Sequence, residues 1–177
     1  MLRVSICAGT IGGEEGGGGA VLGEELIVLA ACGSDASLPT NPALPADLFT
    51  ACLTTPIRMA LRTTCRNALF WIADELADAM PGSSAGRRSP LGELHWTFTA
   101  VTDAIAWDTL PRETFRKLFR QDMLLASLFR NFLLAQRVMG RYGVHPISRP
   151  ALPDTRQHPL WEAWDYAVDS VVSQVLA

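Results

Sequence analysis

A short apolar run near the start of the chain constrains its fold more than any other feature. Residues 25–32 read ELIVLAAC and end at the turn-forming residues Gly33, Ser34 and Asp35. A run this short that is apolar on both faces is typical of a strand in a parallel sheet covered on both sides. Residues 3–7 are the one segment that could pair with it, and two strands alone make a marginal sheet. We therefore predict a buried strand that lacks neighbours, and interpret the chain as a fragment of a larger fold.

Beyond residue 46 the sequence has the pattern of helices joined by short links. Leu94, Phe98, Val101 and Ile105 are spaced four, three and four apart, which predicts one buried stripe of a helix. Helix 123–139 is apolar around more than half its circumference and needs neighbours on two sides. Helices are predicted over residues 47–54, 57–80 with a break near Asn67, 90–107 after the N-cap Ser89, a short stretch from Pro111, 123–139 and 160–175, with a proline-rich loop over 143–159. These helices favour either antiparallel pairs of the armadillo or HEAT type or a compact bundle.

The overall composition is that of a folded protein rather than a disordered one. The hydrophobic fraction is 49%, with five Trp and seven Phe. A net charge of -3 and a pI near 5.6 give no reason to expect nucleic acid or an acidic membrane as a partner. The sequence has no run of about 18 apolar residues, so we expect no membrane span. Residues 11–19, IGGEEGGGG, predict a flexible linker or tail.

The cysteines and histidines form no recognisable catalytic or metal-binding pattern. The four cysteines contain no C-x-x-C pair and match no zinc spacing, which indicates free thiols in a reducing, intracellular compartment. Cys32 lies at the carboxyl end of the predicted strand, a place where catalytic cysteines do occur, but peptidase chemistry needs a neighbouring imidazole. We therefore expect no catalytic, cofactor-binding or metal-binding residue, and keep a caspase-like cysteine peptidase as an alternative. The residues considered are Cys7, Cys32, Cys52, Cys65, His95, His145 and His158.

Arg87 and Arg88 are the one local charge feature with a candidate binding role. They lie between two predicted helices, directly before the helix start at Ser89 and Pro90. A guanidinium fork suits carboxylates, and the N-terminus of a helix adds favourable potential for an anion. The pair is therefore either two solvated loop arginines or a docking point for an acidic group of a partner. The sequence alone does not choose between these two interpretations.

Several long segments, read together, carry a resemblance to a known family. They are LPADLFTACLTTPI at 44–57, RRSPLGEL at 87–94 continuing through IAW at 105–107, LPR at 110–112, KLFRQD at 117–122, ASLFRNFLLA at 126–135 and WEAWD at 161–165. These segments closely resemble raptor, the regulatory scaffold subunit of target-of-rapamycin (TOR) complex 1. The resemblance covers roughly residues 25–177, and residues 1–24 match nothing in the family.

The resemblance implies a domain organisation. Raptors begin with a caspase-like domain, continue into a helical armadillo or HEAT solenoid and end in a WD40 propeller. The chain would then be mainly α. A flexible Gly-rich segment over 1–24 would precede the terminal part of the α/β caspase-like domain over 25–60, which holds one buried strand. Residues 61–177 would begin the armadillo/HEAT-type solenoid.

The resemblance also implies a function. Raptors are non-enzymatic scaffolds that bind TOR kinase and present substrates carrying a TOR-signalling motif, and so regulate cell growth in response to nutrients. Rag-type GTPases are a further implied partner. The implied location is the cytoplasm, with access to the lysosomal or vacuolar surface through partners. The motif pairs a Phe anchor with acidic residues, and Arg87 and Arg88 are the residues to which we assign the acidic part. A free-standing helical adaptor with no TOR link is the other alternative.

Overall fold

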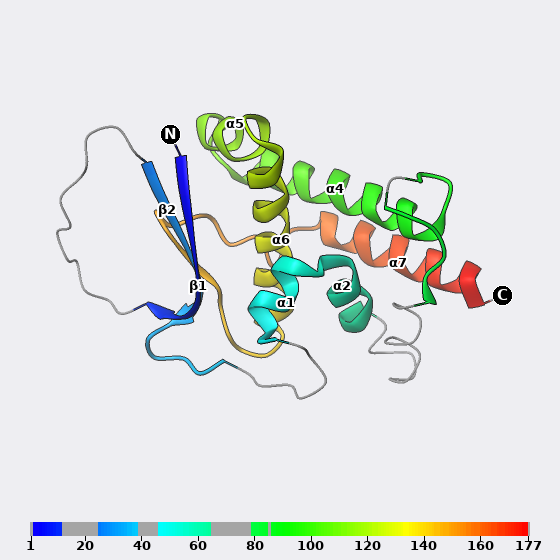
Figure 1. The fold of residues 1–177 in the computed structure, drawn as a ribbon, viewed down its shortest axis with the longest axis horizontal. Coiled ribbons are helices and arrows are strands. Elements are labelled where there is room, and N and C mark those ends of the chain that lie inside the picture. Colours follow the sequence, from blue (N-terminus) through cyan, green and yellow to red (C-terminus); the bar gives the residue numbers. More distant parts are fainter. Residues whose placement is uncertain (1, 12–24, 39–45, 65–78, 85, 177) are drawn as a thin grey trace.

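The fold is mainly helical, with a small sheet at one end (Figure 1). The computed structural model describes residues 2–11, 25–38, 46–64, 79–84 and 86–176. In chain order the elements are β1 (Leu2–Ile11), β2 (Glu25–Gly33), α1 (Leu48–Thr54), α2 (Pro56–Thr64), α4 (Pro90–Thr109), α5 (Arg112–Arg120), α6 (Met123–Gly140), β3 (Ile147–Arg149) and α7 (Leu160–Leu176). The predicted class, mainly α with a buried strand ahead of the helices, is confirmed.

The sheet has the strand order β1–β2–β3, with β2 in the middle. β1 pairs with β2 in parallel, as predicted for residues 3–7. β3 pairs antiparallel with β2, where Leu29 lies opposite Ser148. The prediction that β2 lacks a second neighbour was wrong, because β3 lies inside the segment 143–159 that we expected to be a loop. A strand of only three residues is too short to show the period-2 pattern that reveals strands in a sequence.

The N-terminal segment differs from the expectation in the part that the structure describes. Residues 2–11 form β1, whereas a flexible segment was predicted over 1–24. Residues 12–24 lie outside the described part of the chain, and so does most of the helix predicted over 57–80, with the break expected near Asn67. The division of the chain at residues 24 and 60 stays a prediction.

Local sequence signals explain where the helices begin. The side chain of Asp47 accepts a hydrogen bond from the backbone N–H of Thr50 at 3.0 Å and caps α1. Ser89 caps α4 with Pro90 in its first turn, as predicted. Asp122 caps α6 by accepting from the N–H groups of two residues in its first turn. Each cap satisfies a backbone donor that the helix itself leaves unpaired.

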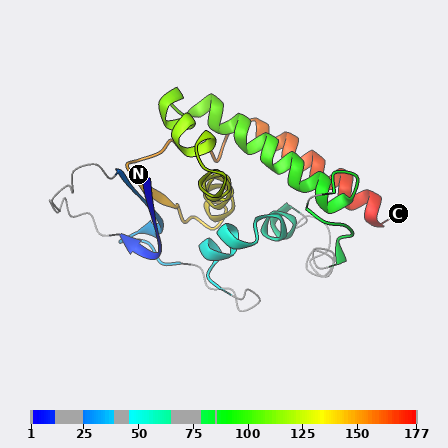
Figure 2. The same cartoon turned by 45° about the horizontal axis from the view of Figure 1, so that its top comes forward.

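The core is built around α6, which lies at the centre of the molecule (Figures 1 and 2). α6 contacts α1, α2, α4 and α5, which confirms that this strongly apolar helix has neighbours on more than one side. α4 and α7 run side by side in both views. Phe98 on α4 and Trp164 on α7 make an edge contact, with their ring centroids 5.5 Å apart. Phe49 on α1 and Phe132 on α6 make a similar edge contact at 6.3 Å. The large buried aromatic side chains therefore join helices that are distant in sequence.

The predicted buried stripe of α4 faces this core. Leu94, Phe98, Val101 and Ile105 are all buried. Among the described helices, none has the length and apolar character needed to cross a membrane.

Candidate functional site

The loop before α4 positions the two arginines singled out by the sequence. The hydroxyl of Ser89 donates to the carbonyl of Gly86 at 2.7 Å and accepts from the backbone N–H of Gly92 at 3.2 Å. The backbone N–H of Leu91 donates to the carbonyl of Pro81 at 3.3 Å, which ties the start of the loop to the first turn of α4. The segment that carries Arg87 and Arg88 is therefore held at both ends.

Two glycines allow this loop to close tightly on the helix. A Cβ at Gly92 would lie 1.9 Å from the carbonyl oxygen of Gly86, so the loop backbone passes directly over the first turn of α4. Gly82 has a φ of 107°, and a Cβ there would lie 2.1 Å from the Cβ of Ser89. Both positions require a residue without a Cβ. At Gly92 the reason is the lack of space, and at Gly82 it is both the lack of space and the positive φ.

Arg87 lies over the ring of Trp96. Its guanidinium carbon is 3.6 Å from the ring centroid, which is a close cation–π contact. Trp96 is 52% exposed, so the stacked pair lies on the surface of α4. The ring covers one face of the guanidinium and leaves its N–H groups, which point outward in the plane of the fork, available to a carboxylate. This arrangement can hold an acidic side chain next to an aromatic surface.

The structure places the second predicted arginine beside the first and adds Trp96, which was not predicted, to the candidate site. Arg88 is exposed beside Arg87 and forms no hydrogen bond or ion pair with the residues that the structure describes. Sequence reasoning missed Trp96. The signal was present, because Trp96 lies two residues after Leu94 and so on the opposite side of the helix from the predicted buried stripe. A large aromatic residue on the solvent side of a helix was the available clue.

The described thiols are not arranged for nucleophilic chemistry. The Cys32 thiol is fully buried and donates to the carbonyl of Ala36 at 3.5 Å, and burial, together with the charge of Asp35, raises its pKa. Burial, with a smaller effect of Asp47, raises the pKa of Cys52 to about 12. Both groups are therefore protonated at neutral pH, whereas a nucleophilic cysteine needs a lowered pKa. The side chains of Cys7 and Cys65 lie outside the described part of the structure.

None of the three histidines is hydrogen-bonded to the described thiols. His158 lies 3.0 Å from the carboxylate of Asp108, and His145 lies 2.6 Å from the guanidinium of Arg156. Burial lowers the pKa of His95 on α4. None of the three makes a hydrogen bond to Cys32 or Cys52. Within the residues described, no group of three or more His, Cys, Asp or Glu side chains is placed to hold a metal ion.

Comparison with known proteins finds close relatives for most of the chain. It is 58% identical over 152 residues to the "Protein raptor homolog" of Dictyostelium discoideum, which covers 85% of this chain and 10% of that protein. It is 51% identical over 151 residues to the "Target of rapamycin complex 1 subunit mip1" of Schizosaccharomyces pombe, covering 84% of this chain and 12% of that protein. The chain thus spans about a tenth of the length of these relatives. No protein-family model matches it.

A solved structure has the same fold. The crystal structure of Chaetomium thermophilum Raptor is 61% identical in sequence and superimposes with a TM-score of 0.78. The superposition covers 84% of this chain and 14% of that chain. The two chains are therefore alike both in sequence and in the arrangement of their helices and strands.

Proposed function

This chain belongs to the raptor family, and on that premise we propose that it is a non-enzymatic scaffold segment of TOR complex 1. In this role it contributes to binding TOR kinase and to recruiting substrates that carry a TOR-signalling motif. The observation that carries the proposal is the identity of 51–58% with a raptor homologue and with a TOR complex 1 subunit over some 150 residues. The complex would operate in the cytoplasm and reach the lysosomal or vacuolar surface through partners such as Rag-type GTPases.

The geometry before α4 supports a specific part of this role. We assign the docking of an acidic substrate side chain to Arg87, with Arg88 beside it. Arg87 is stacked on Trp96, and its loop is tied to α4 through Ser89 and Gly92. A guanidinium that is already held in place loses less conformational freedom when it binds a carboxylate. The ring of Trp96 also offers an apolar surface to a neighbouring part of the same ligand.

The alternative functions have less support. A caspase-like peptidase needs an activated thiolate beside a histidine, and both described thiols are buried with raised pKa values. A free-standing helical adaptor would not account for the long identity to a TOR complex 1 subunit. We therefore propose that the chain has no catalytic activity, no bound cofactor and no bound metal.

Exchanging the segment into a relative tests the docking role. Residues 25–177 would replace the matching segment of the Schizosaccharomyces pombe relative, and the affinity for a labelled peptide with a Phe anchor and acidic residues would be measured. Arg87→Ala should weaken binding at least about tenfold, because truncating one partner of a water-excluded charge pair costs about 2 kcal/mol or more. Trp96→Ala should weaken it in the same direction, because the guanidinium loses its support. Added salt should weaken binding by the unmutated protein.

A matched control keeps this test specific. Arg156→Ala also removes one positive charge, but from a guanidinium that pairs with Asp154 in the segment after β3. The control should leave the affinity unchanged within about twofold. Equal affinity for the unmutated and Arg87→Ala proteins would refute the docking assignment and show that Arg87 is a solvated loop arginine without a role in binding.

A further inference from the structure

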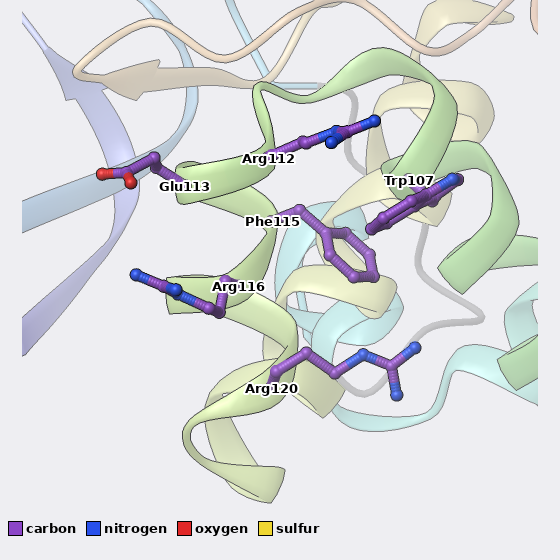
Figure 3. A pocket seen from close by; sticks show the side chains of 6 residues that line it. All are labelled: Trp107, Arg112, Glu113, Phe115, Arg116 and Arg120. Atoms are coloured by element: carbon purple, nitrogen blue, oxygen red, sulfur yellow. The ribbon is translucent and has the colours of Figure 1, made fainter.

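A second cationic and aromatic surface lies at the other end of α4. A cavity of about 290 Å³ opens between the end of α4 and α5, lined by Trp107, Arg112, Glu113, Phe115, Arg116 and Arg120 (Figure 3). We call it the α5 pocket. Trp107 follows Trp96 by eleven residues, which is about 16 Å along a helix. The α5 pocket is therefore separate from the Arg87 loop.

The apolar floor of the pocket is anchored in the core. Trp107 is 58% exposed, yet its ring meets Phe115 edge to face at 5.1 Å. The rings of Phe115 and Phe119 are stacked nearly parallel, with their centroids 5.2 Å apart. The ring of Phe119 in turn packs against Phe129 on α6, with a centroid distance of 6.4 Å. A surface tryptophan backed by a row of buried rings has a fixed position. The floor is therefore formed before any ligand arrives.

Two arginines flank this floor. Figure 3 shows the side chains of Arg112 and Arg120 on the same side of α5 as the rings of Trp107 and Phe115, whereas Arg116 extends to the other side, where Glu113 lies. The guanidinium carbon of Arg120 is 5.3 Å from the centroid of Phe115. Neither Arg112 nor Arg120 forms an ion pair with a residue that the structure describes. Two positive groups that have no ion pair among the described residues thus border an apolar surface.

We propose that the α5 pocket binds an acidic, extended segment of a partner protein, with one apolar side chain on the aromatic floor and a carboxylate on each side of it. The spacing supports this occupant. Arg112 and Arg120 are eight residues apart, about 12 Å along the helix axis. In an extended chain the residues i, i+2 and i+4 point to one face, and the outer two are about 13 Å apart.

The chemistry between the two arginines favours this ligand over a compact anion. A phosphate or sulfate group would bring no apolar surface to the rings of Trp107 and Phe115. An acidic–x–apolar–x–acidic segment covers the rings and pairs both guanidinium groups with carboxylates, which suits the bidentate geometry of arginine. Burying part of the exposed Trp107 ring adds a favourable hydrophobic contribution.

The test titrates the 177-residue chain with a labelled peptide and measures fluorescence anisotropy. The peptide has two aspartates four residues apart, a leucine midway between them and serine elsewhere. Arg112→Gln and Arg120→Gln should each weaken binding about fivefold or more, since each removes one partly screened ion pair. Arg156→Gln removes the same charge from the segment after β3, outside the α5 pocket, and should change the affinity by less than about twofold. Replacing the leucine by serine, or placing the aspartates side by side, should also weaken binding.

Several outcomes would overturn the proposal. Equal losses for Arg156→Gln and Arg112→Gln would indicate a general attraction between the charges of the protein and the peptide, without a specific site. Equal affinity for the peptide with adjacent aspartates would remove the spacing argument, and the absence of saturable binding would refute the site. A dimer in solution that Trp107→Ser dissociates would show that a second copy of the chain covers the pocket. Circular dichroism of each variant checks that the helices are intact, and none of these variants alters Arg87.

Discussion

The two faces of α4 differ in what they contact and in what they can do. The inner face carries Leu94, Phe98 and Ile105, which are buried against the core. The outer face carries Trp96 and Trp107, which are 52% and 58% exposed, and each lies beside arginine side chains. Both faces carry large apolar residues, so the presence of such residues alone does not distinguish them. The difference is that the inner residues have helical neighbours and the outer ones have charged neighbours.

This difference separates stability from recognition on one helix. Large aromatic residues with only partial cover are a frequent mark of interaction surfaces, especially when arginine is present. Substitutions on the inner face should therefore destabilise the fold, whereas those on the outer face should leave the fold intact and affect binding.

The largest effect is expected for a matched pair of aromatic truncations on α4. Phe98→Ala should lower the free energy of unfolding by about 3–5 kcal/mol, because it removes a buried ring packed on Trp164. Trp107→Ala should lower it by about 1 kcal/mol, because more than half of that side chain is already exposed and mainly the ring contact with Phe115 is lost. Urea denaturation followed by circular dichroism measures both. Equal losses of stability would show that the two faces of α4 contribute equally to the core.

A smaller effect is expected where the loop closes over the first turn of α4. Gly92→Ala should cost about 2–3 kcal/mol, because the added Cβ would collide with the backbone carbonyl of Gly86 and the loop would have to shift. The matched control is Gly143→Ala, where no atom lies within 4 Å of the added Cβ and the cost of about 1 kcal/mol comes from its φ of 73° alone. Thermal unfolding of both variants provides the measurement. A Gly92→Ala protein as stable as the control would show that the loop is not held on the helix.

The smallest effect concerns His95, which lies between the two faces. Burial lowers its pKa in the folded chain, so the unfolded chain binds more protons below the ordinary pKa of about 6.5. The contribution of His95 to stability is therefore intact above that pH and falls as the pH drops below it. Comparing the unfolding free energy of the unmutated chain and His95→Gln between pH 7.5 and about 5 isolates this contribution. A pH dependence that is identical in both proteins would place His95 in solvent.

The sequence was sufficient for the inner face but not for the outer one. The four, three and four spacing identified Leu94 and its partners, and the Ser89–Pro90 pair located the start of α4. Periodicity reports which residues face a core, whereas it carries no information on which loop residue stacks on an exposed ring. The contact between Arg87 and Trp96 and the approach of α5 to Trp107 both depend on tertiary packing. β3 was missed for a related reason, since its three residues form a strand because β2 is beside them.

The proposed scaffold role of this segment can be tested by exchanging it into a relative and measuring the association with TOR kinase. Residues 25–177 would replace the matching segment of the Schizosaccharomyces pombe relative, and the recovery of TOR kinase with the purified exchanged protein would be quantified. A Phe98→Ala version of the exchanged segment serves as the control for a damaged fold. We expect the exchanged protein to recover TOR kinase nearly as well as the parental protein does, and the Phe98→Ala control to recover clearly less. A soluble, folded exchanged protein that recovers no TOR kinase would refute the proposed scaffold role.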